Sequence, residues 1–194
     1  MDTLLQKVQS RFPYVTAEKL ADILAMGEVV VVQPGEILFK EGVNNARAAI
    51  VLEGILRNYT YNSKGEEITT LLVDELRAAA PYSNIFLNKP ATETTEAVEQ
   101  SLVFLFVFPE VQQKMEQDLV LLRLYKDLVQ DALINSIQRI EDFTRLNPVQ
   151  RYERLLQDRP TLLDRVPLKF LASYLGITAV SLSRIRKRIS KSRN

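Results

Sequence analysis

The stretch from Val166 to Ile189 (VPLKFLASYLGITAVSLSRIRKRI) constrains the fold more than any other part of the sequence. Apolar residues recur at helical spacing on both sides of Gly176, and this spacing predicts two short helices joined by a sharp turn. Glycine reaches positive φ at little cost, which suits that turn. Thr178 follows the turn and is a good N-cap for the second helix, because its hydroxyl can accept a bond from an orphan backbone N–H.

The second predicted helix separates apolar from polar side chains. We expect it to bury Ile177, Leu182, Ile185 and Ile189. We expect it to turn outward Ser181, Ser183, Arg184, Lys187 and Arg188. Hydroxyls near the start of a helix and cations along one face suit the major groove of DNA. The alternative is an ordinary helical hairpin whose basic face is solvated.

Charge is distributed unevenly along the chain. Its formal net charge is only +1, yet residues 165–194 contain eight basic and no acidic residues. The remaining 164 residues carry 17 basic and 24 acidic ones and are therefore net negative. This asymmetry predicts that the C-terminal segment binds a polyanion while the rest of the chain stays away from it.

The sequence contains no cysteine and no histidine. This excludes disulfides, cysteine-ligated iron–sulfur clusters and histidine-ligated haem, and it removes the commonest general base and metal ligand. We therefore expect no cofactor, no metal site and no catalytic residue. No apolar run approaches the roughly 18 residues of a membrane span, and the N-terminus lacks the pattern of a secretory signal. We expect a protein of the cytoplasm without a membrane segment.

The hydrophobic period changes twice along the chain. Residues 3–26 read as helical, with Pro13 as an interruption and Thr16 as an N-cap. Short runs rich in β-branched, aliphatic or aromatic residues then alternate with turn residues and predict an antiparallel jelly roll over about residues 28–108. Within it, we expect a helical turn at Asn84–Leu87 and one more strand at Thr92–Val98.

After Pro109 the apolar spacing predicts a long helix that ends before Pro148. A further helix should begin at Pro148 and stop before Pro160. The long helix has an apolar stripe that either pairs with its twin in a homodimer or packs on its own β domain; we favour the dimer seam. The seam residues would be Leu122, Leu128, Val129, Ala132, Leu133, Ile137 and Ile140.

A jelly roll, a long helix and a helix-turn-helix, in this order, resemble the bacterial Crp–Fnr transcription regulators. The resemblance is carried first by Pro34-Gly35-Glu36-x-Leu38-Phe39-x-Glu41-Gly42, Leu52-Glu53-Gly54-x-Leu56-Arg57 and Gly65-Glu66-Glu67. It is carried most specifically by Arg151-Tyr152-Glu153-x-Leu155-Leu156, Val166-Pro167-Leu168-Lys169 and Leu171-Ala172-Ser173-Tyr174-Leu175-Gly176-Ile177-Thr178. It implies an α+β chain with a sensor domain over 1–108, a dimerisation helix over 109–146 and a DNA-binding domain over 147–194.

The resemblance implies a ligand pocket in the sensor domain but not its usual ligand. Cyclic-nucleotide binders of this fold hold the ribose with a Glu and the cyclic phosphate with an Arg. The matching positions here fall near Ala80-Pro81 and Ala91-Thr92, so both groups are absent. A buried phosphate without a cation is costly, and we expect no tight binding of cyclic AMP or cyclic GMP. The pocket residues would be Ala80, Pro81, Tyr82, Ala91 and Thr92.

The resemblance also assigns roles on the second helix. Ala179 and Val180 stand where the best-known members have Arg-Glu, so these two can offer only apolar contact to thymine methyl groups. Arg184 matches a third base-reading position and would bind guanine. Phosphate contacts are expected from Lys169, Ser181, Lys187 and Arg188, with Thr178 as a cap or phosphate donor.

These patterns together predict a homodimeric regulator that binds double-stranded DNA and is not an enzyme. The alternative is a jelly-roll sensor or scaffold that binds a protein partner or small ligand without reading DNA. A metal-dependent jelly-roll enzyme is disfavoured because histidine is absent. A small-molecule effector and a contact with RNA polymerase fit the resemblance, and the sequence identifies neither.

Overall fold

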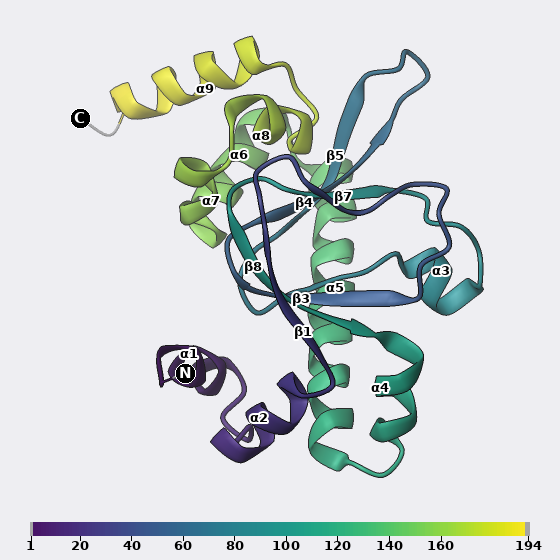
Figure 1. Ribbon diagram of the computed structural model, residues 1–194. Coiled ribbons are helices and arrows are strands. Elements are labelled where there is room, and N and C mark those ends of the chain that lie inside the picture. The colour runs from purple at the N-terminus through teal and green to yellow at the C-terminus, as the bar shows by residue number, and fades with distance from the viewer. Residues whose placement is uncertain (1, 193–194) are drawn as a thin grey trace.

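Two antiparallel sheets, a long helix and a group of short helices make up the chain (Figure 1). The computed structural model describes residues 2–192 and the side chains of residues 3–190. Arg193 of the predicted basic segment lies outside the described residues, as does the side chain of Lys191. The strands are β1 (Gly27–Val32), β2 (Ile37–Phe39), β3 (Arg47–Glu53), β4 (Leu56–Tyr61), β5 (Glu67–Val73), β6 (Ala78–Ala79), β7 (Thr94–Ala97) and β8 (Ser101–Val107). The helices are α1 (Asp2–Arg11), α2 (Ala17–Leu24), α3 (Tyr82–Leu87), α4 (Phe108–Met115), α5 (Leu119–Arg145), α6 (Pro148–Asp158), α7 (Pro160–Arg165), α8 (Leu168–Tyr174) and α9 (Ala179–Ser192).

The two sheets confirm the predicted jelly roll. Their strand orders are β1-β8-β3-β6 and β2-β7-β4-β5, and every pairing is antiparallel. Side chains alternate across each strand, so every second residue points between the sheets. Val51, Val73 and Val103 fill that interior and are almost fully buried.

The segment after β5 differs from the prediction. Strand β6 (Ala78–Ala79) pairs with β3, although two alanines carry no strand signal of their own. The predicted helical turn at Asn84–Leu87 is confirmed as part of α3, which begins two residues earlier at Tyr82. The strand predicted at Thr92–Val98 is shorter in the structure, where β7 spans Thr94–Ala97.

The N-terminal helices close one end of the molecule. The Oγ1 atom of Thr16 accepts a bond from Lys19 N at 3.1 Å, which confirms the predicted N-cap of α2. Leu20 and Ile23 of α2 are buried in a core that also contains Phe104 of β8 and Leu121 of α5. The sheet β1-β8-β3-β6 is therefore covered on its outer face by helices.

The predicted helix between Pro109 and Pro148 is two helices. Met115 ends α4 and is buried in the same core, and α5 begins at Leu119. The break occurs because Asp118 caps α5: its Oδ1 accepts bonds from Val120 N at 3.1 Å and Leu121 N at 3.0 Å. Helix α5 then runs along the β domain toward α6 (Figure 1).

Helix α6 begins at Pro148, as predicted, and stops before Pro160. Asn147 precedes it and forms a capping box with Gln150, in which each side chain bonds the backbone N–H of the other residue. Tyr152 and Leu155 on the inner side of α6 join the core of the C-terminal helices. This core supports the two helices of the predicted helix-turn-helix.

Candidate DNA-recognition surface

Helices α8 and α9 form the hairpin that the sequence predicts. Gly176 lies in the turn between them with a φ of 68°, a conformation that disfavours residues with a Cβ. A Cβ at this position would also lie 2.7 Å from Phe143 Cε1, so the turn is closed against α5. Thr178 Oγ1 accepts a bond from Ser181 N at 3.1 Å and thereby caps the start of α9.

The packing of α9 matches the predicted division of its faces. Leu182 is fully buried and Ile189 nearly so, in a core shared with Leu162 and Leu171. Ile177 and Ile185 pack against that core and are partly buried. The opposite face of α9 is thereby left for solvent or a partner.

The exposed face of α9 forms a shallow concavity with the start of α8. Val180 is 61% exposed, and Arg184, Lys187 and Arg188 are exposed as well. Ser181 is half-buried and lies 3.0 Å from Thr178 Oγ1 through its Oγ. The lining residues of the concavity are Leu168, Ala179, Val180, Ser183, Arg184 and Lys187. Predicted base-reading and phosphate-binding residues thus share one surface.

Not every predicted residue reaches this concavity. Lys169 is exposed at the first turn of α8, and its Nζ lies 4.5 Å from the centroid of the Phe170 ring. It does not line the concavity, and neither does Arg188. Both remain on the exposed surface of the helix-turn-helix, where phosphate contacts require less exact placement than base contacts.

Two cations of the basic segment hold the fold instead of facing solvent. Arg186 donates from Nη2 to Leu163 O at 2.8 Å, which ties α9 to α7. Arg165 is paired with Glu75 at 2.7 Å and with Glu99 at 2.5 Å. Among the described side chains, the exposed cations of this segment are therefore Lys169, Arg184, Lys187 and Arg188.

The helix-turn-helix is docked on the sheet β2-β7-β4-β5, a contact that sequence reasoning missed. Thr69 N of β5 donates to Ser173 Oγ of α8 at 2.9 Å, and Ser173 Oγ donates to Glu67 O at 3.2 Å. Arg57 of β4 is 2% exposed and lies beneath the ring of Phe170, with its Cζ 3.6 Å from the ring centroid. Its charge is balanced by Glu96 at 2.7 Å and Glu67 at 2.5 Å.

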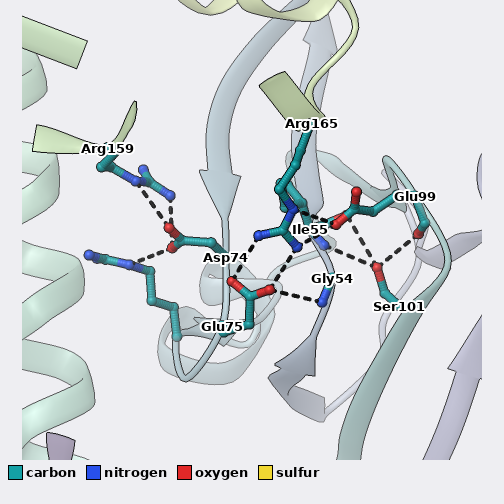
Figure 2. Close-up of polar contacts among 9 residues, drawn as sticks. Gly54, Ile55, Asp74, Glu75, Glu99, Ser101, Arg159 and Arg165 are labelled. Atoms are coloured by element: carbon teal, nitrogen blue, oxygen red, sulfur yellow. Dashed lines mark hydrogen bonds and ion pairs between the residues drawn. The ribbon is translucent and has the colours of Figure 1, made fainter. Parts of the chain in front are cut away.

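A second group of ion pairs fixes α7 to the loops of the β domain (Figure 2). Arg165 projects between Glu75 and Glu99, and Arg159 donates to Asp74 at 2.8 Å (Figure 2). Glu75 also accepts from Gly54 N at 3.2 Å, so the carboxylate bridges the β3–β4 turn and α7. The sequence does contain an acidic pair after a strand, Asp74-Glu75, and arginines on both sides of Pro160. Their positions in the sequence do not indicate that these groups form ion pairs.

Helix α5 divides its apolar residues between two faces. Leu121 and Leu124 are buried against the β domain, and Leu128 packs there as well. Leu128 was predicted on the seam, and the structure places it on this inner face, where it is partly buried. Ala132 is half-buried and lines a cavity beside that core.

The other predicted seam residues are exposed, and two of them, Val129 and Leu133, lie at the edge where they also line that cavity. Leu122 is 43% exposed, Val129 39%, Leu133 57%, Ile137 49% and Ile140 67%. Their spacing of three, four and seven residues places them on one side of the helix. Isolated exposed apolar residues are ordinary, whereas a row along about five turns is typical of an interaction face.

A cavity lies beside the segment predicted to form a ligand pocket. It is lined by residues of the β domain, including Asn58, Thr70, Tyr82 and Glu93, and by Ser136, Arg139, Ile140 and Phe143 of α5. Of the predicted pocket residues, only Tyr82 lines it. Glu93 Oε2 accepts a bond from Asn58 Nδ2 at 3.2 Å, so a carboxylate stands in this cavity where a phosphate binder would carry a cation.

A second, apolar cavity of about 340 Å³ lies between the outer face of β1-β8-β3-β6 and helices α4 and α5. Ala80 and Tyr82 line it together with Phe104, Phe108 and Leu128. Burial raises the pKa of Tyr82 to about 12, so its hydroxyl is neutral at physiological pH. Thr92 is exposed, and Ala91 is held by backbone bonds to Gly42 and Val43. Pro81, Ala91 and Thr92 line neither cavity.

We compared the chain with known protein families and solved structures to identify its fold. Residues 29–118 match the family model of the cyclic nucleotide-binding domain. FixK2 from Bradyrhizobium japonicum superposes with a TM-score of 0.72 at 14% identity, over 86% of this chain and 85% of that one. The c-di-GMP-responsive global regulator CLP of Xanthomonas campestris gives 0.73 at 14% identity, over 91% and 93%. TTHA1359 of Thermus thermophilus, a transcriptional regulator of the CRP/FNR family, gives 0.63 at 19% identity, over 85% and 87%.

The chain has the Crp–Fnr regulator fold. Curated protein sequences give no match. The predicted resemblance is confirmed, and so is the combination of a cyclic-nucleotide-binding-like jelly roll with a C-terminal helix-turn-helix. Of these structural neighbours, CLP is described as a global regulator of gene expression and TTHA1359 as a transcriptional regulator.

Two further observations on this chain concern ions and membranes. Within the described residues, no three acidic side chains are gathered as a metal site would need. No single helix among residues 2–192 has the length and apolar composition to cross a membrane; α8 and α9 together pass on composition but are bent by 94°.

Proposed function

We propose that this chain is a homodimeric, sequence-specific DNA-binding transcription regulator of the Crp–Fnr type. The observation that carries the proposal is the division of α9: Leu182 is fully buried, whereas Val180, Arg184 and Lys187 line an exposed concavity. A helix held from one side by its core presents the other side to a major groove. DNA lies in the cytoplasm of a bacterium, and we place the protein there.

The proposal assigns different work to neighbouring residues of α9. Arg184 would bind guanine, because a guanidinium reaches its O6 and N7 with two hydrogen bonds. Ala179 and Val180 would contact thymine methyl groups. Lys169, Ser181, Lys187 and Arg188 would contact phosphates, which position the protein without reading sequence. Thr178 acts first as the cap of α9.

The exposed row on α5 supports a homodimer. Leu122, Val129, Leu133, Ile137 and Ile140 would meet their twins along a two-fold axis. Two copies of α9 would then enter successive major grooves about one helical turn apart and read a pseudo-palindrome. In this scheme residues 1–108 act as the sensor, residues 109–146 as the dimerisation segment and residues 147–194 as the DNA reader.

Glu93 supports a further element of the proposal, that cyclic AMP and cyclic GMP are not effectors. Its carboxylate lines the cavity beside α3, and neither the Glu nor the Arg of the phosphate cassette stands at the matching positions. A cyclic phosphate there would meet the carboxylate of Glu93, and the cation in the lining, Arg139, comes from α5 and not from the phosphate cassette. An effector of another class would act by changing how the helix-turn-helix is docked on the β domain.

The experiment that tests DNA binding is a titration of a generic fluorescent duplex, followed by anisotropy at several salt concentrations. A DNA reader releases condensed counterions, so log K falls steeply as log salt rises. Replacing Lys187 and Arg188 by Gln should reduce that slope, whereas replacing Lys64 on the β4–β5 turn should not. A flat slope for the wild-type protein would favour the alternative, a scaffold that does not bind DNA.

A further inference from the structure

A polar cavity of about 290 Å³ lies at the junction of the sensor domain, α5 and the C-terminal helices. Five arginines line it: Arg77, Arg139, Arg151, Arg154 and Arg159. Two carboxylates, those of Asp142 and Asp158, line it as well. So many guanidinium groups around one cavity give it a cationic wall.

Two of these arginines have no carboxylate partner among the described residues. Arg139 donates to Tyr174 O at 3.0 Å and to Thr69 O at 3.2 Å. Arg151 donates to Leu175 O at 3.1 Å and to Leu146 O at 2.7 Å. Each guanidinium has five N–H donors, and these bonds use two in each residue. Arg139 also bonds the side chain of Tyr174. Three donors of Arg151 and two of Arg139 are therefore left for another acceptor.

The two guanidinium groups lie close to one another. Both pack on the ring of Phe143, with Cζ 4.8 Å from its centroid for Arg139 and 4.6 Å for Arg151. Burial lowers the pKa of Arg139, and the neighbouring charge of Arg151 lowers it further. The charge of Glu93 acts on Arg139 in the opposite direction. Among the described residues, however, no carboxylate forms an ion pair with either guanidinium, so a bound anion would compensate their charge.

The remaining arginines are compensated, which separates them from this pair. Arg77 bonds Asp74 at 2.7 Å and Asp131 at 2.6 Å, and Arg159 bonds Asp74 at 2.8 Å. Arg154 bonds Asp142 at 2.5 Å, and its side chain is 44% exposed at the mouth of the cavity. The unmatched positive charge is thus concentrated at Arg139 and Arg151.

The cavity stays open in the proposed dimer. On α5 it is lined by Asn135, Gln138, Arg139, Asp142 and Phe143. In the exposed row, Leu133 precedes Asn135 by two residues, and Ile140 precedes Asp142 by two. Two residues correspond to about half a turn of an α-helix, so the row and these cavity residues lie on opposite sides of α5. The twin of α5 would pack on the opposite side.

We propose that this cavity binds a small polyanion carrying phosphate or carboxylate groups. Arg139 and Arg151 would grip it with paired N–H donors, the arrangement that suits the oxygens of both groups. A ligand here would touch α5, α6 and Arg77 of the sensor domain at once, and it would hold the helix-turn-helix in its docked position. The binding step does not depend on whether the chain reads DNA.

Calorimetry with the full chain at low ionic strength tests this proposal, with inorganic pyrophosphate and citrate as separate probes. Saturable binding of one anion per chain is expected for at least one probe, and the stronger probe identifies phosphate or carboxylate as the preferred group. Arg151→Gln should weaken binding by about tenfold or more, the effect of one lost charge-assisted bond. Arg154→Gln, an exposed change, should weaken it less and keep the fold intact.

Arg145→Gln is the matched control, because Arg145 lies on α5, is exposed and does not line the cavity. It should bind pyrophosphate as the wild-type protein does. The proposal is overturned if neither probe binds more tightly than about 1 mM, or if Arg145→Gln weakens binding as much as Arg151→Gln. Thermal unfolding with and without pyrophosphate gives a second measure, since a specific anion raises the midpoint of the wild-type protein.

Discussion

Arg165 Nη2 donates to Glu75 Oε1 at 2.7 Å, although the two residues are 90 positions apart in the sequence. The bond joins α7 to the end of β5 (Figure 2). The pKa of Arg165 is raised by this bond and by a second one to Glu99. The C-terminal helices are therefore fixed to the β domain by charge as well as by packing.

Arg165→Gln should loosen this attachment. We expect the free energy of unfolding to fall by about 1–2 kcal/mol, less than for a fully buried pair, because both side chains are nearly one third exposed. Chemical denaturation measures the change. Arg188→Gln removes an exposed cation of α9 and should leave stability as it is. Equal stability of Arg165→Gln and wild type would contradict a stabilising role for the pair.

The attachment should weaken in acid. Burial alone would raise the pKa of Glu75, but bonds from Arg165 and from backbone N–H groups lower it below its usual value. A carboxylate with a depressed folded pKa stabilises the fold at pH values above its unfolded pKa, and this stability is lost as pH falls through the folded pKa.

Stability measured from pH 7 down to about pH 3 should therefore fall more steeply for the wild-type protein than for Glu75→Gln, which has no proton to gain. Glu53→Gln on the same side of the β domain is a suitable control and should retain the wild-type slope. Identical slopes for wild type and Glu75→Gln would show that this carboxylate does not contribute to the pH dependence.

Leu133→Asp should break the proposed dimer, since a charge would enter an apolar seam. Sedimentation equilibrium should give about twice the 22.2 kDa chain mass for the wild-type protein and a shift toward the single-chain mass for Leu133→Asp. Ile134→Asp changes a neighbouring side chain that is 45% exposed on another face of α5, so it should remain dimeric. If both variants are dimers, the seam lies elsewhere.

Cyclic AMP and cyclic GMP should not bind tightly to the cavity beside α3. We expect calorimetric titration with either nucleotide to give no affinity at the level of about 1 μM or better. The reason is the lining carboxylate of Glu93 and the missing cassette cation. A micromolar dissociation constant for either nucleotide would refute this part of the account.

Local elements could be predicted from the sequence where a local cause sets them. The turn at Gly176 and the caps at Thr16 and Thr178 depend on residues within a few positions of one another. The jelly roll was also predictable, because its strands are rich in β-branched residues and bounded by turns. Strand β6 was not, because Ala78 and Ala79 form it only by pairing with β3.

The contacts between the β domain and the C-terminal helices could not be predicted from the sequence. Ser173 bonds Thr69 across 104 residues, and no period or spacing relates those positions. The basic segment shows the same difficulty, since composition does not separate Arg184 on the surface from Arg165 and Arg186 in internal bonds. The pattern predicted the helix-turn-helix, and only the tertiary structure shows which cations of α9 are exposed.

The affinity of Arg184→Ala for a selected operator tests the central claim most directly. Duplexes enriched from a random pool by the wild-type protein supply the operator, which should be two-fold symmetric with half-sites about one turn apart. Anisotropy with the operator and with generic DNA then compares Arg184→Ala and Lys187→Ala. We predict that Arg184→Ala loses about 1–3 kcal/mol on the operator and relaxes one base position per half-site, whereas Lys187→Ala weakens both duplexes alike. Wild-type affinity and selectivity in Arg184→Ala would contradict the assignment of α9 as the reader of DNA sequence.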